Sequence, residues 1–202
     1  MGDLKTYGEI YDEEFLEKFG EYRKDVEQTE LDNKYSVNVE KIAELCKIKV
    51  LYKKLDVSGT CMNLHSSVND ETSEYMTNLN LRIILVNQLE PLVRQRFTIA
   101  HEIGHILLGH EGISYRDPNY QKYNDLIKRA NEANANSFAA ELLMPEILLR
   151  DVIDNSIKNL GFDSKSMFSD ADIDYLAYYA ANEMCVSITA LKYRLMNLKI
   201  FR

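Results

Sequence analysis

The sequence predicts an α+β fold, with a small sheet in the N-terminal half followed by helices. Two runs are typical of strands: IKVLYKKL at 48–55, and LRIILVN at 81–87, which is rich in β-branched residues. A third run, VSGTCMNLH at 57–65, is expected to pair with the first after a turn near Gly59. From Glu90 onward the apolar residues recur at helical spacing. The change from strand-like runs to helical spacing predicts the fold class.

The N-terminal region is predicted to form one amphipathic helix over residues 9–28. Its apolar side chains follow one another at steps of four, four, three and four; they are Tyr11, Phe15, Phe19, Tyr22 and Val26. The first 40 residues hold twelve acidic and five basic side chains, which is most of the net charge of −8. We expect residues 1–35 to be an acidic amphipathic arm. It either packs on the domain or serves as a docking or autoinhibitory arm for a basic partner.

The remaining helices are predicted from apolar spacing and from residues that favour helix ends. Asn38 suits the N-cap of a helix at 38–46, and Ser187 suits the N-cap of the last one. The other expected helices are one or two within 90–109, one at 119–143, one from Pro145 to about 155, and one at 169–184, with a loop at 110–118 and a tight turn at 185–187.

The composition favours a cytoplasmic protein that does not contact the membrane. No apolar run approaches the roughly 20 residues of a spanning helix, and the first residues lack the apolar region of a secretory signal. Cys46, Cys61 and Cys185 are far apart and form no C-x-x-C, which is typical of reduced thiols. Because the chain is acidic overall, direct binding to DNA phosphates is not expected.

Residues 101–105, HEIGH, carry the pattern H-E-x-x-H. On a helix, positions i and i+4 lie about 40° apart and one turn along, so His101 and His105 can reach one metal ion. Two imidazoles and a carboxylate favour Zn²⁺, with a water in the fourth position. Glu102 then stands where it can take a proton from that water. The alternative is a pair of ordinary helix histidines.

The other two histidines are not expected to bind this ion. His110 is nine residues beyond His101, about 180° round the helix if the helix continues, and is expected to interact with the helix C-terminus. His65 falls in a predicted strand or turn and is taken as an ordinary histidine.

A third metal ligand is predicted on the next helix, at Glu132. Ala135, Asn136 and Ala139 share its face, and small side chains there would let this helix approach the first closely. Gly104 on the first helix suggests that another backbone comes near. Asn136 is placed to hydrogen-bond a ligand. The alternative for Glu132 is a surface acid, which suits Glu141, on the opposite face, better.

Two stretches together resemble the ImmA/IrrE family of zinc metallopeptidases. They are RFTIAHEIGHILLGH and the later E-x-x-A-N-x-F-A-A-E-L-L-M-P, from Glu132 to Pro145. LRIILVN resembles the family's preceding strand. The resemblance implies that His101, His105 and Glu132 bind zinc on two helices of a zincin-like fold, and that Glu102 is the catalytic base. It also implies a protein substrate, typically a helix-turn-helix repressor of a phage or mobile element.

We therefore expect a zinc metallopeptidase domain at 36–155, followed by a helix-turn-helix-like segment at 156–202. Leu191, Leu195 and Leu198 predict that the last helices pack on the catalytic core rather than bind DNA. Tyr115 is a candidate donor to the oxyanion. The alternative to an endopeptidase is a non-catalytic, zinc-containing regulator that binds a repressor or toxin partner.

Overall fold

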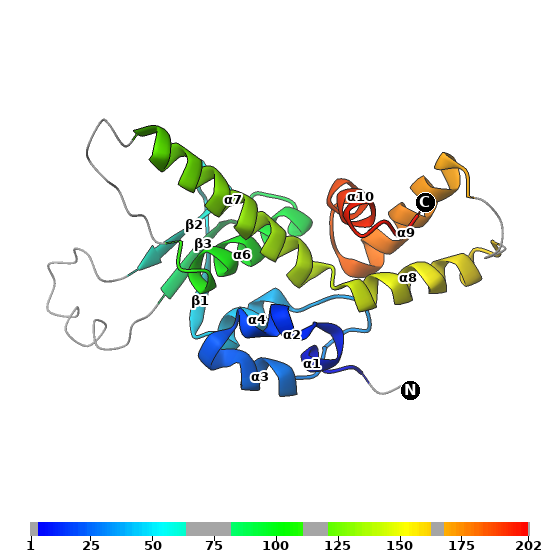
Figure 1. Ribbon diagram of the computed structural model, residues 1–202, viewed down its shortest axis with the longest axis horizontal. Helices are drawn as coiled ribbons and strands as arrows, with labels where there is room; N and C mark the ends of the chain where they lie inside the picture. The colour runs from blue at the N-terminus through cyan, green and yellow to red at the C-terminus, as the bar shows by residue number, and fades with distance from the viewer. Residues whose placement is uncertain (1–3, 64–81, 111–120, 163–167, 202) are drawn as a thin grey trace, which may run out of the picture.

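The computed structural model describes residues 4–63, 82–110, 121–162 and 168–201. Its fold is α+β, as predicted (Figure 1). The elements in chain order are α1 Tyr7–Ile10, α2 Glu13–Glu17, η1 Gly20–Tyr22, α3 Arg23–Gln28, α4 Val39–Leu45, β1 Ile48–Lys53, β2 Gly59–Asn63, β3 Arg82–Asn87, α6 Leu92–Leu107, α7 Gln121–Leu143, α8 Glu146–Asn159, α9 Asp170–Met184 and α10 Ile188–Asn197. The sheet and α6 lie towards one end of the molecule and α9 and α10 towards the other, with α7 and α8 running between them.

The sheet has the order β1-β3-β2 in the part of the chain that the structure describes. β1 runs parallel to β3 and β2 runs antiparallel to it, so the predicted pairing of β2 with β1 is wrong. β3 is the most apolar of the three strands, and its Ile84 and Val86 are fully buried. The central position suits this strand, because a central strand is paired on both edges and is therefore the most shielded from water.

The single helix predicted for residues 9–28 is also wrong. The segment forms three short α-helices and one 3₁₀ turn, because the helix is interrupted at two places. Asp12 caps α2 by accepting a hydrogen bond from the backbone of Phe15, and Gly20 has a positive φ of 55°, which a helix does not contain.

Most apolar residues of this segment are nevertheless buried, with Tyr22 only partly so, and the segment packs against α7, the helix that carries Glu132. The rings of Phe15 and Phe138 are 5.0 Å apart between centroids, and the Tyr11 hydroxyl donates a 2.7 Å hydrogen bond to the Leu142 carbonyl. The N-terminal helices therefore share one core with α7.

The later helices follow the predictions closely. Asn38 caps α4 through the Lys41 backbone, α6 is one continuous helix, and α8 begins after Pro145 but continues to Asn159. The α9–α10 turn has Cys185 in the left-handed conformation and Ser187 as the N-cap of α10. The predicted loop at 110–118 lies almost entirely outside the described residues. None of the helices that the structure describes has the length and apolar content to cross a membrane.

Arg96, on α6, ties three distant segments together. Its guanidinium donates to the carbonyls of Cys185 and Val37 and to the Ser36 hydroxyl, at 2.8–3.1 Å. Burial lowers the pKa of Arg96, yet the group stays charged because its ordinary pKa is so high. The α9–α10 turn is thereby fastened to the helix that carries the H-E-x-x-H motif.

We predict that Arg96→Met lowers the free energy of unfolding by about 2–3 kcal/mol, because charge-assisted bonds are lost and carbonyls are left without a donor. Urea denaturation measures this change. Arg94→Met is the matched control on the same helix; the Arg94 side chain is 64% exposed, so its ion pair contributes less than about 1 kcal/mol. Equal losses in the two variants would contradict the account of Arg96.

Candidate metal and active site

Helix α6 presents two faces with different roles. Ile99, Ala100, Ile103 and Ile106 are buried in the core. His101 and His105 lie on the other side, towards α7, and their side chains are only 17% and 19% exposed. The apolar spacing of the helix thus fixes the direction in which both imidazoles point.

Three side chains from two helices bring ligand atoms to one place. The Nε2 atoms of His101 and His105 are 3.0 Å apart, and each lies 3.4 Å from a different carboxylate oxygen of Glu132. Ligands at about 2.0–2.1 Å from a tetrahedral zinc ion are separated from one another by about 3.3–3.4 Å. The observed separations are close to these values, so the three side chains could hold a single ion, and the Glu132 side chain is 60% exposed.

Glu132 reaches the histidines because α6 and α7 cross closely at Gly104. A Cβ atom added to Gly104 would lie 3.0–3.2 Å from the Phe138 side chain, while Ala135 and Ala139 are fully buried in the same contact region. Close approach was predicted from the glycine and the alanines. The nearest neighbour of Gly104, however, is the Phe138 side chain and not a backbone.

We predict that Gly104→Val destabilises the protein by about 1–3 kcal/mol, because the added side chain must displace the buried Phe138 ring, which packs against Phe15 and Phe19. The same change should weaken zinc binding by displacing α7 and Glu132. Ala133→Val, on the exposed face of α7, controls for a β-branched residue in a helix. Thermal unfolding and zinc titration of both variants measure the effects, and wild-type zinc affinity in Gly104→Val would contradict the prediction.

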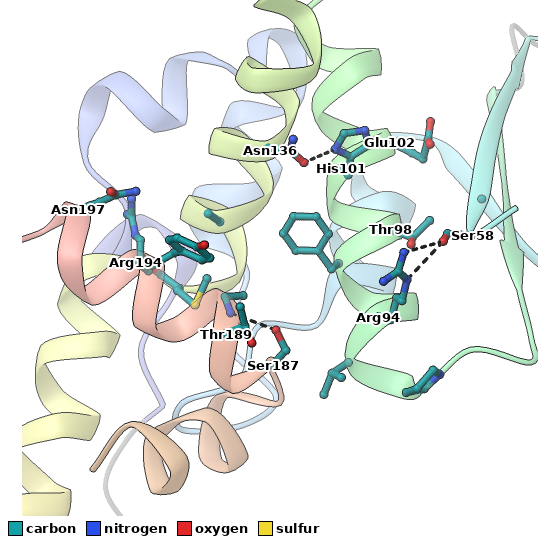
Figure 2. A pocket seen from close by; sticks show the side chains of 18 residues that line it. Ser58, Arg94, Thr98, His101, Glu102, Asn136, Ser187, Thr189, Arg194 and Asn197 are labelled. Atoms are coloured by element: carbon teal, nitrogen blue, oxygen red, sulfur yellow. Dashed lines mark hydrogen bonds between the residues drawn. The ribbon is translucent and has the colours of Figure 1, made fainter. Parts of the chain in front are cut away.

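Asn136 lies within hydrogen-bond distance of His101 Nδ1, the ring nitrogen that faces away from Glu132 and His105. Its Oδ1 lies 3.0 Å from His101 Nδ1 (Figure 2). When His101 carries its proton on Nδ1, this nitrogen donates to Asn136, and the unprotonated Nε2 faces Glu132 and His105. The amide thus selects the tautomer that a metal ligand requires.

Glu102 lies on the side of α6 that faces the sheet (Figure 2). Burial raises the pKa of its carboxyl, and the nearby Glu132 acts in the same direction. A hydrogen bond from the Cys61 backbone, on β2, opposes that rise, and so does His101 whenever its imidazole is protonated. A carboxylate with a raised pKa is a stronger base, which suits proton transfer near neutral pH.

The comparison with protein families agrees with this geometry. The family model for the IrrE N-terminal-like domain matches residues 43–196, about three quarters of the chain. The chain belongs to this family. The resemblance to ImmA/IrrE proteins, which depended on the two helical motifs, is therefore confirmed.

Two curated IrrE-family relatives are similar over part of their length. Both are named radiation response metalloprotease IrrE. The one from Deinococcus deserti is 38% identical over 71 residues, which are 35% of this chain and 25% of the relative. The one from Deinococcus radiodurans is 37% identical over 73 residues, which are 36% of this chain and 22% of the relative. The matches thus span about a quarter of the length of these relatives.

In this IrrE-family chain, a cleft of about 790 Å³ runs from His101 and Glu102 to α10. Figure 2 shows the two site residues at one end of the cleft and Arg194 and Asn197 of α10 across from them. Most of its length is lined by apolar or small side chains, among them Val93, Phe97, Ala140, Met144 and Ala190.

The structure separates the other predicted residues. Glu141 lies away from the metal ligands, 3.5 Å from Lys18 and 3.9 Å from Arg194. Tyr115 and His65 lie outside the described residues. His110, predicted to point away from the ligands, has its Nδ1 only 3.2 Å from Nδ1 of His105, because α6 ends before it.

Proposed function

We propose that this chain is a cytoplasmic zinc-dependent endopeptidase that cuts a protein regulator. The observation that carries the proposal is the convergence of His101, His105 and Glu132 on one point, at the end of a long cleft that also holds Glu102. Family membership supports the same activity, and the resemblance to ImmA/IrrE proteins implies a helix-turn-helix repressor of a phage or mobile element as the substrate.

The three ligand residues suit zinc by both chemistry and spacing. Two neutral imidazoles and one carboxylate form a common catalytic zinc set. The two 3.4 Å distances to Glu132 equal the spacing expected around a tetrahedral ion, and the 3.0 Å distance between the imidazoles is slightly shorter. Burial lowers the pKa of His105, which keeps its imidazole neutral and able to ligate at pH 7. When bound, zinc supplies Lewis-acid polarisation of the scissile carbonyl and acidifies a water molecule.

The remaining chemistry belongs to Glu102. Its carboxylate accepts a proton from the attacking water as the water oxygen bonds to the scissile carbonyl carbon, and then delivers that proton to the amine nitrogen as the peptide C–N bond breaks. Contact with the Cys61 backbone holds the carboxylate beside the sheet. The same carboxylate therefore serves in both halves of the reaction.

The cleft suits an extended peptide better than a small molecule. β2 is an outer strand of the described sheet and borders the cleft at Gly59, so a substrate backbone can pair with its edge. Helix α10 forms the far wall and the largely apolar lining accepts apolar side chains. A flexible segment of a regulator meets these requirements.

A DNA-binding function for the last helices is not supported by their charges. The two basic residues of α10 are already paired within the protein. Lys192 lies 2.6 Å from Asp174, and Arg194 donates to the Met144 carbonyl and lies near Glu141. With both side chains engaged in these contacts, α10 is better suited to line the cleft, as its residues do, than to bind phosphate.

The proposed function is tested by incubating the zinc-loaded chain with the small helix-turn-helix protein encoded nearest to its gene. We expect specific cleavage that stops on chelation and returns with one equivalent of zinc. Mass spectrometry of the products locates the scissile bond. Release of the regulator from its operator without cleavage would instead support the non-catalytic regulator.

A further inference from the structure

We propose that His110 is a positioning residue for His105: its Nδ1 accepts a hydrogen bond from His105 Nδ1–H, and so holds His105 Nε2 towards the metal. The inference rests on the metal site of the proposed function. It adds to that site a residue that is neither a ligand nor a catalytic group.

The end of helix α6 explains how His110 reaches His105. Gly109 has a φ of +66°, its N–H bonds to the Ile106 carbonyl, and the His110 N–H bonds to the His105 carbonyl at 3.0 Å. These two bonds define a Schellman motif, in which Gly109 is the left-handed C′ residue and His110 is C″. The motif folds the chain back, so that C″ lies over the residue five positions earlier.

In most Schellman motifs the side chains at C″ and C3 make an apolar contact. Here both positions are histidines, with ring centroids 5.1 Å apart and planes at 74°. Their Nδ1 atoms are 3.2 Å apart, within hydrogen-bond distance. The contact between the C″ and C3 side chains, which usually only stabilises the end of a helix, therefore involves a ring nitrogen of the proposed ligand His105.

The tautomers that this contact requires are those of a metal site. If His105 ligates through Nε2, its neutral ring carries the proton on Nδ1 and needs an acceptor there. His110 supplies that acceptor when its own proton is on Nε2. Asn136 Oδ1 stands in the same relation to His101 Nδ1, at 3.0 Å. Each proposed imidazole ligand thus has a neutral hydrogen-bond acceptor at its Nδ1 atom. For His101 this acceptor is Asn136 of α7, and for His105 it is His110 at the end of α6.

The test compares His110→Ala with His110→Asn. An asparagine Oδ1 occupies nearly the position of a histidine Nδ1, so it retains the acceptor, whereas alanine removes it. Zinc affinity is measured by competition with a chelating indicator at fixed pH. We expect a loss of about 10–100-fold for His110→Ala, and wild-type affinity within a few-fold for His110→Asn. The backbone bond of residue 110 is kept in both variants.

Two further measurements separate positioning from stability. The unfolding midpoint of the metal-free protein should differ little between the two variants, because the contact joins two partly exposed side chains at the end of a helix. In the zinc-loaded wild type, ¹⁵N-detected imidazole spectra should show His105 protonated at Nδ1 and His110 protonated at Nε2 alone.

Wild-type zinc affinity in His110→Ala, or equal losses in both variants, would overturn the inference and leave the proposed zinc site standing. A proton on His110 Nδ1 in the zinc-loaded protein would overturn it as well. Failure of the wild-type chain itself to bind one zinc ion would overturn both the inference and the proposed function.

Discussion

Glu102→Gln is expected to abolish peptide hydrolysis and to leave the metal site filled. Glutamine has nearly the same shape as glutamate but cannot accept a proton, so kcat should fall by about 10²–10⁴-fold, the usual contribution of general acid–base catalysis. Zinc content should stay at one per chain, because Glu102 is not among the three converging ligand residues. Cleavage rates and metal analysis of the same sample test both parts.

This variant also separates the two functional classes. A binding protein with a structural zinc site would release its partner equally well with glutamine at position 102. Undiminished release, with the substrate intact, would exclude the peptidase mechanism. Formation of a stable complex without cleavage would support it, because the cleft that receives the chain is unchanged.

Glu132→Ala should remove the metal, and with it the activity. Among the described residues, the substitution deletes the ligand that α7 contributes and leaves two imidazoles on one helix. Zinc affinity should therefore fall by more than the roughly 100-fold that marks the loss of an outer hydrogen-bonding partner. Titration with a chelating indicator measures the change. Because the Glu132 side chain is 60% exposed, we expect no large loss of fold stability.

Glu141→Ala is the matched control for this prediction. Glu141 is a second glutamate of α7, but its carboxylate lies beside Lys18 and Arg194. Its removal should leave zinc affinity unchanged. Equal zinc binding by Glu132→Ala and the wild type would show that α7 contributes nothing to the metal site.

The site was largely predictable from the sequence because its residues lie on regular helices. A fixed rotation per residue places His101 beside His105, and the small side chains near Glu132 indicate a close contact between two helices. The apolar residues that recur at helical spacing after Glu90 likewise form the buried face of α6. Local periodicity is sufficient wherever a single element, or one contact between two elements, determines the geometry.

The features that were not predicted depend on where a helix ends, or on contacts between segments that are far apart in the sequence. The aromatic residues from Tyr11 to Phe19 have helical spacing, yet the chain breaks at Asp12 and Gly20 and still buries them. The position of β3 in the centre of the sheet follows from competition among all three strands, which no single strand reveals.

His110 was misplaced for the same reason. Its predicted direction assumed that α6 continues, whereas Gly109 ends the helix and reverses the chain. The glycine directly before His110 was the available signal, since glycine is the commonest C′ residue of a helix. A helix end can therefore alter a site as much as a helix face does.

A crystal structure of the zinc-loaded protein, with anomalous diffraction recorded at the zinc absorption edge, tests the central claim most directly. We expect one ion per chain, bonded to His101 Nε2, His105 Nε2 and a carboxylate oxygen of Glu132. An ion bound elsewhere, or a Glu132 side chain turned away from the two imidazoles at full zinc occupancy, would contradict the account.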